Sequence, residues 1–521
     1  MIYQIGDYIK LIITIISFID FLVFIVFFLS FMIRIPYKAK EISTRVISIL
    51  VIIFFIGFKI LHLPIFVASI SFINFKIPGS IIIISVLTWI NILLAVVPLL
   101  FAIITAFIYR RPSNEKLKEF SSKYVNIIMP IYNEDPLSLQ RAIESVLNLD
   151  YPKDLIHLYL AFDEGVIDTL NSDACVKLLE YYSITPFDKR TRIDLYDKGV
   201  LLSICRFDHG GKKSAQYGAF KEMEKDNKDI NDSFVFFIDS DIILQEDSLS
   251  QFTYHMEHNK KSALTGVITC VTSKNPSFLT FYQDIEYVSG QIFWRNLEVY
   301  LGSTTCLPGA FTVLRYSFLK KVSDKYFNST VYEDNTDYQR FYLGEDRYLT
   351  HLLMEIEPWK LGFCEIARCK TDAPNTLISL LKQRRRWYLG HIANDTWMIS
   401  SLKLWKTYPI LCLFNLLNNT RNTSIYIYLL YFVLLLNKDT DLYLWLLFII
   451  LPIILNWIFI GLYALKIKRK MNFLFYIVIL IFQPILSMMY MYYTIWTINQ
   501  KSWGGARVEN QKTKELSVEI V

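Results

Sequence analysis

Long apolar stretches lie at both ends of the 521-residue chain, and a stretch of mixed polarity separates them. A membrane-spanning helix needs about 20 mostly apolar residues. Three N-terminal runs meet this length, near residues 11–33, 46–70 and 79–109. Further apolar runs lie near residues 408–417, 424–436, 442–465 and 473–496. We therefore expect α-helical transmembrane bundles at both ends. The number of C-terminal crossings is left open, because Gln483 and Pro484 interrupt the last run.

Basic residues flank the N-terminal runs. They cluster in segment 34–45, between the first two runs, and at Arg110 and Arg111 after the third. Since Lys and Arg are retained on the cytoplasmic side of a membrane, both segments and the chain after Arg111 are expected in the cytosol. Asp20 lies inside the first run, where a carboxylate is costly in lipid, so we expect it to face a neighbouring helix. That run is too long for a signal peptide and lacks a basic leader.

The pattern changes after Pro112 to short β-branched or aromatic runs that alternate with amphipathic stretches. Val125–Ile131, His157–Phe162 and Phe234–Ile238 are predicted to be buried strands, and Leu137–Leu147 a helix. Such alternation indicates an α/β domain with a mostly parallel sheet. The predicted organisation is therefore about three transmembrane helices in residues 1–111, a cytosolic α/β domain ending in interfacial helices in 112–402, and transmembrane helices with a tail in 403–521.

Acidic side chains follow each of the three predicted strands. They are Glu134, which follows Asn133, then Asp163 with Glu164, and Asp239 with Asp241. In open α/β sheets the ligand binds beyond the carboxyl ends of the strands. Because side chains two residues apart in an extended segment point to one side, Asp239 and Asp241 are predicted to converge on one cation while Ser240 points away. Carboxylates and substrate phosphates commonly hold Mg²⁺ or Mn²⁺. A surface turn is the alternative for an isolated Asp pair.

Two later clusters add candidate chemistry. Asp346 stands beside Arg347, which by itself is more often a structural ion pair than a catalytic group. On a helix, Gln383, Arg386 and Trp387 share a face. The planar guanidinium of an Arg can bind pyrophosphate through two hydrogen bonds, and a sugar ring can stack on the flat face of a Trp. A basic interfacial helix beside the membrane is the alternative for this segment, and both descriptions can hold together.

The segment His209–Lys213 precedes a helical stretch and could set amines and backbone N–H groups around phosphate. It is not a P-loop, because the GxxxxGK[ST] pattern is absent, so a nucleoside triphosphatase is not supported. A solvated lysine pair at the start of a helix, including Lys212, is the alternative.

The amino-acid composition excludes further classes of protein. With 53% hydrophobic and 20% charged residues the chain is neither disordered nor a small disulfide scaffold. The net charge of +6 is accounted for by Lys and Arg beside apolar segments, so no nucleic-acid partner is expected. The seven cysteines contain no CxxC pair and are expected to be free thiols.

Taken together, these motifs resemble the processive family 2 glycosyltransferases, and chitin synthases most closely. The resemblance runs from about Val125 to Trp387 and, more loosely, to Trp503. The motifs that carry it are PIYNED at Pro130–Asp135, Asp163, the DSD at Asp239–Asp241, CLPGAF at Cys306–Phe311, GEDRYLT at Gly344–Thr350 and QRRRW at Gln383–Trp387. The tail departs from the family's SWGTR pattern, because Gly505 and Ala506 precede Arg507.

The resemblance implies a Rossmann-like GT-A fold that transfers N-acetylglucosamine from UDP-GlcNAc to the 4-hydroxyl of a growing β-1,4 chain, with inversion. Asp346 would be the general base, and Asp241 with Asp239 would hold Mg²⁺ or Mn²⁺. The implied donor-binding residues are Glu134, Asp163, Lys212, Asp239, Gln383 and Arg386. Trp387 and Trp503 would bind the acceptor. The implied setting is a multi-pass protein of the plasma membrane that exports the chitin chain across the bilayer, with a homo-oligomer left open.

Three alternatives remain at this point. A hyaluronan synthase would use the same machinery but would need UDP-glucuronate as a second donor. A transporter or channel with a cytosolic nucleotide-binding domain would carry polar residues along several spans, whereas these spans are mostly Ile, Leu and Phe. A glycoside hydrolase would use paired carboxylates without a diphosphate site.

Overall fold

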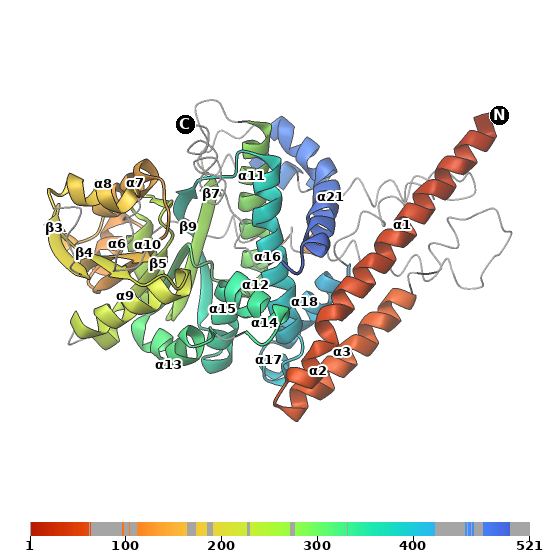
Figure 1. Ribbon diagram of the computed structural model, residues 1–521, viewed down its shortest axis with the longest axis horizontal. Helices are drawn as coiled ribbons and strands as arrows, with labels where there is room; N and C mark the ends of the chain where they lie inside the picture. The colour runs from red at the N-terminus through yellow and green to blue at the C-terminus, as the bar shows by residue number, and fades with distance from the viewer. Residues whose placement is uncertain are drawn as a thin grey trace, which may run out of the picture. The chain divides into compact units, whose positions relative to one another are not determined.

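The computed structural model of the chain describes eight segments and some scattered residues between 63 and 104 and between 454 and 462 (Figure 1). The segments are 2–61, 112–163, 173–184, 191–226, 230–270, 277–330, 332–421 and 473–500. The chain divides into two compact units. One comprises Met1–Tyr109 with His391–Gln500, and the other Arg110–Gly390 with Lys501–Val521.

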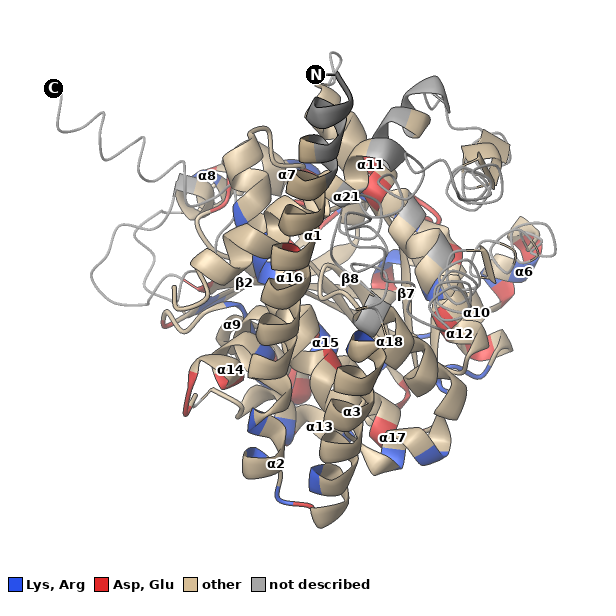
Figure 2. Cartoon of the chain, turned by 90° about the vertical axis from the view of Figure 1, so that its right-hand side faces the viewer, with Lys and Arg blue, Asp and Glu red and all other residues tan. Residues whose placement is uncertain are grey.

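The first unit is helical. Its described helices are α1 (Ile2–Met32), α2 (Arg34–Lys38), α3 (Ile42–Ile60), α17 (Leu402–Thr407), α18 (Pro409–Arg421) and α21 (Phe473–Trp496). Two helical stretches, Leu11–Lys38 and Ile42–Ile60, are long and apolar enough to cross a membrane. Figure 2 shows α1 and α3 as mostly uncharged along their described lengths. The C-terminal run that contains Gln483 and Pro484 forms one helix, α21. The expected runs at 79–109, 424–436 and 442–465 fall almost entirely outside the described residues.

Asp20 of the first helix has an oppositely charged neighbour within this unit. Asp20 is 1% exposed and interacts electrostatically with Lys59 of α3. The Lys59 ammonium also lies 4.7 Å from the ring centroid of Phe24. A buried charge is tolerated when an opposite charge lies nearby, so the attraction between Asp20 and Lys59, together with the Phe24 ring, favours the packing of α1 against α3.

The second unit is built on a nine-stranded sheet. Its strands, in the order β3-β4-β2-β1-β5-β8-β7-β9-β6, are β1 (Val125–Ile131), β2 (Ile156–Asp163), β3 (Arg192–Asp197), β4 (Val200–Phe207), β5 (Phe234–Ile238), β6 (Ile243–Leu244), β7 (Ala263–Cys270), β8 (Phe311–Arg315) and β9 (Leu361–Thr371). Two of the three predicted strands, β1 and β5, have the predicted bounds, and β2 extends one residue further at each end. The α/β class is therefore confirmed.

The prediction of a mostly parallel sheet is wrong, because half of the pairings between the described strands are antiparallel. One cause is local. Lys198 and Gly199 both have positive φ, which suits the two-residue turn of a hairpin, and β3 and β4 therefore pair antiparallel. A second antiparallel pairing joins β8 to β5. The first residue of β8, Phe311, pairs with the last residue of β5, Ile238. The segment before β8 thus lies at the carboxyl end of β5.

Helices cover both faces of the sheet. Those of the second unit are α6 (Asn114–Glu119), α7 (Pro136–Leu147), α8 (Asp173–Tyr181), α9 (Lys212–Asp226), α10 (Ser248–His258), α11 (Phe278–Ser289), α12 (Asn296–Tyr300), α13 (Tyr316–Phe327), α14 (Asn335–Tyr338) and α15 (Glu345–Ile356). α16 (Leu377–Met398) continues into the first unit. Figure 1 shows α7 and α8 on one side of β3 and β4 and α9 on the other. α7 starts at Asp135, whose side chain accepts from the N–H of Ser138 before Pro136 opens the helix.

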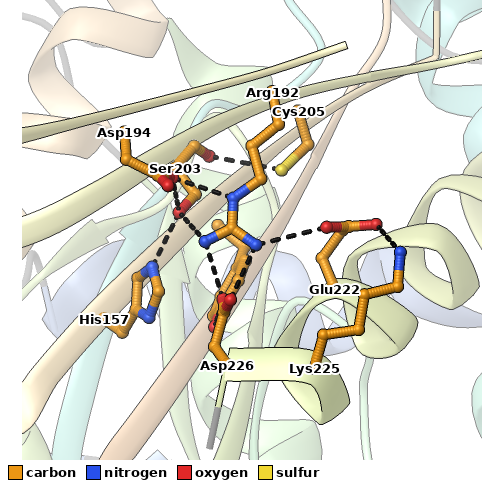
Figure 3. Close-up of polar contacts among 9 residues, drawn as sticks. His157, Arg192, Asp194, Ser203, Cys205, Glu222, Lys225 and Asp226 are labelled. Carbon is orange, nitrogen blue, oxygen red and sulfur yellow. Dashed lines mark hydrogen bonds and ion pairs between the residues drawn. The ribbon is translucent and has the colours of Figure 1, made fainter.

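A polar network fixes the end of α9 to the sheet (Figure 3). The Arg192 guanidinium donates to Asp226 at 2.7 and 2.8 Å, to Asp194 at 2.9 Å and to Glu222 at 3.2 Å. Ser203 donates to Asp194 at 2.6 Å and contacts His157 at 2.7 Å. Burial lowers the pKa of His157 to about 4, so this imidazole is neutral at neutral pH. Strands β2, β3 and β4 are thereby tied to the last two turns of α9.

Replacing Arg192 with Met should destabilise the protein, because Asp194 and Asp226 would lose their shared cation. The Arg192 and Asp226 side chains are 20% and 25% exposed, so the loss should be about 2 kcal/mol rather than that of a fully buried pair. This corresponds to a fall in Tm of about 4 to 8 °C in thermal unfolding of the purified protein.

Lys225→Met is the matched control, because Lys225 pairs with Glu222 on the same helix but is 68% exposed. Its Tm should change by about 1 °C or less, as expected for an exposed ion pair. Equal losses in the two variants would show that the network does not anchor α9.

Candidate active site

The acidic residues predicted at the strand ends meet where the strand order reverses. The chain passes from β1 to β2 and β4 on one side, and then returns to β5 on the other side of β1. Ligands of open α/β sheets bind at this kind of position. Glu134 and Asp239 follow β1 and β5, and Asp163 is the last residue of β2, so the fold places all three at one edge of the sheet.

Glu134 connects the loops after β1 and β5. Its carboxylate accepts from the Ser240 hydroxyl at 2.5 Å and from the backbone N–H of Asp135 at 3.2 Å, and the residue is 9% exposed. Ser240 therefore points to the Glu134 side. The hydroxyl fixes the DSD segment and leaves its two aspartates to face other elements.

The extended geometry predicted for the DSD segment is wrong. Asp239–Asp241 forms a turn, in which the N–H of Ile242 donates to the Asp239 carbonyl at 3.2 Å. The chain leaves the sheet here to reach β6, so it cannot remain extended. The two carboxylates still share a neighbour, because both act on the Cys369 thiol of β9 and, together with burial, raise its pKa. Asp241 also accepts from the Thr371 hydroxyl at 3.0 Å.

Two carboxylates at this turn, Asp239 and Asp241, could contribute oxygen ligands to a metal ion. Asp239 and Asp241 provide hard oxygen donors of the kind that Mg²⁺ and Mn²⁺ prefer. Among the described residues no group of three or more His, Cys, Asp or Glu could hold a metal by itself. The donor set therefore fits an ion that takes its remaining ligands from a bound phosphate or from water.

Asp163 is held by the loop that follows β4. The N–H groups of Gly210 and Gly211 donate to its carboxylate at 2.8 and 2.9 Å, and His209 Nδ1 lies 3.1 Å from it. Burial raises the pKa of Asp163, and these donors oppose that rise. The expectation that these N–H groups surround phosphate is wrong, because they bind a carboxylate. Gly211 has φ +85°, and Tyr342 lies 3.3 Å from the position of an added Cβ, so a side chain would be strained there.

Lys212, the first residue of α9, joins two acidic loops. Its ammonium lies 2.7 Å from the Asp239 carboxylate and 3.6 Å from that of Glu345. Burial alone would lower the pKa of Lys212, but the two carboxylates outweigh it and raise the pKa. Burial also raises the pKa of Glu345, and Lys212 opposes this. Asp346 follows Glu345, so Lys212 links the DSD turn to the GEDR segment.

Asp346 lies in the first turn of α15 against the CLPGAF segment. One carboxylate oxygen accepts from the Arg347 N–H at 2.7 Å, and the other lies 3.4 Å from the Cys306 sulfur. The backbone carbonyl of Asp346 accepts from the Thr350 hydroxyl at 2.6 Å. The antiparallel pairing of β8 with β5 is what brings Cys306–Ala310 to this edge of the sheet.

The QRRRW segment lies on α16. Arg386 interacts electrostatically with both Lys212 and Glu345, which places its charge at the site. Trp387 is 37% exposed and packs edge-on against Tyr287 of α11, with ring centroids 5.5 Å apart. Gln383 accepts a hydrogen bond from Arg384. Trp503 lies outside the described residues.

Three residues of the site were not assigned a role from the sequence: Glu345, Cys306 and Arg384. Arg384 is 4% exposed, pairs with Glu286 at 2.6 Å, and stacks 4.1 Å from the Trp387 ring centroid. Glu345 is adjacent to Asp346, and Cys306 is the first residue of the CLPGAF motif, so the sequence motifs already included both residues. Their partners lie far away in sequence, and only the fold reveals them.

Comparison with known proteins assigns the family. The sequence model of chitin synthases matches residues 216–520, which is more than half of the chain. The chain belongs to the chitin synthase family. It is 36% identical to chitin synthase G of Aspergillus niger over 81% of this chain and 58% of that protein. It is 34% identical to chitin synthase 7 of Pyricularia oryzae over 92% of this chain and 60% of that protein. It is 37% identical to chitin synthase VI of Metarhizium acridum over 80% of this chain and 68% of that protein.

This chitin synthase family member thus spans 58% and 60% of the length of two of those relatives. Solved structures resemble it weakly. The mannosyltransferase PcManGT from Pyrobaculum calidifontis, in complex with GDP-Man and Mn²⁺, gives a TM-score of 0.43 at 12% identity, over 79% of this chain and 98% of that one. S. aureus TarS 1-349 in complex with UDP-GlcNAc gives a TM-score of 0.31 at 13% identity, over 54% of this chain and 71% of that one. Both scores are too low to support an argument.

The Arg384–Glu286 pair should be energetically coupled, because Arg384 is buried beside Trp387 and its guanidinium pairs with the half-buried Glu286 carboxylate. Arg384→Met and Glu286→Gln should each lower Tm. The loss in unfolding free energy of the double variant should be smaller than the sum of the two single losses by about 1 to 3 kcal/mol. In the double variant neither an unpaired Arg nor an unpaired Glu remains. Thermal unfolding of the four proteins measures this, and strictly additive losses would contradict the pairing.

Proposed function

We propose that the chain is a membrane-embedded, processive chitin synthase with a GT-A-type catalytic domain. It would transfer N-acetylglucosamine from UDP-GlcNAc to the 4-hydroxyl of a growing β-1,4 chain, with inversion at the anomeric carbon. The observation that carries the proposal is the sharing of Lys212 between Asp239 and Glu345. It joins the DSD turn to the GEDR segment that contains Asp346, in a chain that belongs to the chitin synthase family.

Asp346 would act as the general base that accepts the proton of the acceptor 4-hydroxyl. A general base must come within about 2.6 to 3.2 Å of the oxygen that it deprotonates. Asp346 is partly exposed at the start of α15, whereas neighbouring Glu345 is buried and paired with Lys212, so Asp346 is the carboxylate available to the acceptor.

The donor would lie along the carboxyl edge of the sheet. Asp163 and Glu134 would contact the uridine, Asp163 from the end of β2 and Glu134 from beside the DSD turn that it holds. Lys212, Arg386 and Gln383 would position the pyrophosphate. Asp241 with Asp239 would hold Mg²⁺ or Mn²⁺, which supplies positive charge for the departing UDP. Trp387 would stack on the acceptor sugar, with Trp503 of the tail as a second acceptor contact.

The membrane setting follows from the same proposal. The product is an insoluble polymer made in the cytosol, so the helices before and after the catalytic domain would form its exit path across the plasma membrane. Two helical stretches of the first unit have the length and apolar character that this requires. The direct experiment is to incubate the purified protein with UDP-GlcNAc and Mn²⁺ or Mg²⁺, and to test whether chitinase digests the precipitate.

Replacing Asp346 with Asn should lower the rate of transfer by about 100-fold or more, because the base is lost. Binding of UDP-GlcNAc should stay within about two-fold of wild type, since donor contacts are retained. Radiolabelled polymer formation and donor titration measure the two effects separately. Polymer synthesis near the wild-type rate would exclude Asp346 as the base.

Replacing Asp241 with Asn should weaken UDP binding only when Mn²⁺ is present, because a neutral amide is a poorer ligand of a hard cation. Calorimetric titration of UDP with and without Mn²⁺ measures this difference. If Asp241→Asn binds UDP as wild type does in both conditions, the metal-binding role is wrong.

The nearest alternative is hyaluronan synthesis by the same machinery. It requires UDP-glucuronate in addition to UDP-GlcNAc, so polymer formation from UDP-GlcNAc alone distinguishes the two. Membership of the chitin synthase family favours UDP-GlcNAc as the donor.

A further inference from the structure

The thiol of Cys306 lies against the carboxylate proposed as the base. Its sulfur is 3.4 Å from Oδ2 of Asp346, and Oδ1 of the same carboxylate accepts from the Arg347 N–H at 2.7 Å. Each carboxylate oxygen therefore has a donor from the protein. A side chain held at both oxygens keeps one rotamer, which a general base needs in order to meet its substrate.

The thiol is protonated under the conditions in which the enzyme would work. Cys306 is 8% exposed, and burial, with the nearby Asp346 charge, raises its pKa to about 12. The S–H group therefore donates and Asp346 accepts. A thiol is a weak donor, so it can orient the carboxylate without displacing the acceptor hydroxyl from it.

The backbone around Cys306 is fastened to the same helix turn. The Leu307 N–H donates to the Thr350 hydroxyl at 2.8 Å, and Thr350 donates to the Asp346 carbonyl at 2.6 Å. Arg295 donates to the Cys306 carbonyl. Thr305, the residue before Cys306, is bound to Glu298 through its N–H at 2.9 Å and its hydroxyl at 2.7 Å. The position of the sulfur is thus fixed independently of its contact with Asp346.

Other charged groups near this pair lie on each neighbouring element. Glu345 and Arg347 flank Asp346 on α15, Tyr326 of α13 interacts with Asp346, and Arg295 interacts with Cys306. Lys212 and Arg386 act on Glu345. All of them remain unchanged when Cys306 is replaced, so a change at the base can be assigned to the thiol.

We propose that Cys306 is a positioning residue for the base, whose S–H group holds Oδ2 of Asp346 so that the carboxylate faces the acceptor hydroxyl. The proposal rests on the proposed function, because it takes Asp346 as the group that accepts the acceptor proton. It adds a specific role for the first residue of the CLPGAF segment.

The main test is Cys306→Ala in the full-length protein, with the rate of chitin synthesis measured against pH at saturating UDP-GlcNAc. We expect kcat to fall about ten-fold and the acidic limb of its pH profile to move upward by about half to one pH unit. The charged carboxylate loses the donor that holds Oδ2, which accounts for both changes. The dissociation constant for UDP-GlcNAc should stay within about two-fold.

Two further variants complete the kinetic test. Cys306→Ser keeps a donor at the same position, so its kcat and acidic limb should fall between those of wild type and Cys306→Ala. Cys175→Ala removes a buried thiol from α8, in the hydrophobic core, and should change neither. If Cys306→Ala loses stability but keeps the wild-type acidic limb, the thiol is structural and the proposal is wrong.

A spectroscopic test does not depend on the folding of a Cys306 variant. In the infrared difference spectrum of wild type against Asp346→Asn, one S–H stretching band should move to higher frequency, because an amide accepts more weakly than a carboxylate. An unchanged S–H region would overturn the proposal. If wild type forms no polymer, the proposed function fails, while this measurement still decides whether the thiol binds Asp346.

Discussion

The site depends on one cation shared between two carboxylates. Lys212 stands between Asp239 of the loop after β5 and Glu345 at the start of α15, and it is itself the first residue of α9. Burying any of these charges alone would be strongly unfavourable, whereas the three together compensate one another. The contact therefore fixes the relative positions of three elements that are distant in sequence, and it sets Asp346 beside the DSD turn.

The position of Lys212 is supported from the other end of its helix. α9 begins at the carboxyl edge of the sheet and ends at Asp226, where Arg192 ties it to β3, while Asp226 also accepts from Tyr159 of β2 at 2.8 Å. A helix anchored at both ends cannot slide along the strands. The Arg192 network thus has a functional consequence although it lies at the opposite edge from the candidate site.

The sequence was sufficient for the elements with strong local patterns. The apolar runs of β1 and β5 had the correct bounds, and the acids after them were correctly placed at the carboxyl edge. Two predictions were wrong: the extended geometry of the DSD segment and the phosphate contacts of the His209–Lys213 segment. The conformation of the DSD segment depends on contacts with β9, and the N–H groups of Gly210 and Gly211 bind Asp163 of β2. The roles of Glu345 and Arg384 were missed for the same reason, since Lys212 and Glu286 lie about a hundred or more residues from them.

The most consequential error was the expectation of a mostly parallel sheet. In a parallel arrangement, the segment before a strand lies at its amino edge, away from the ligand. Since β8 is antiparallel to β5, the segment before β8 instead reaches the carboxyl edge beside Ile238. This reversal places Gly309 where an added Cβ would lie 3.2 Å from the Lys212 amine, and it places Cys306 against Asp346. The direction of a single strand therefore decides whether the CLPGAF segment belongs to the site at all.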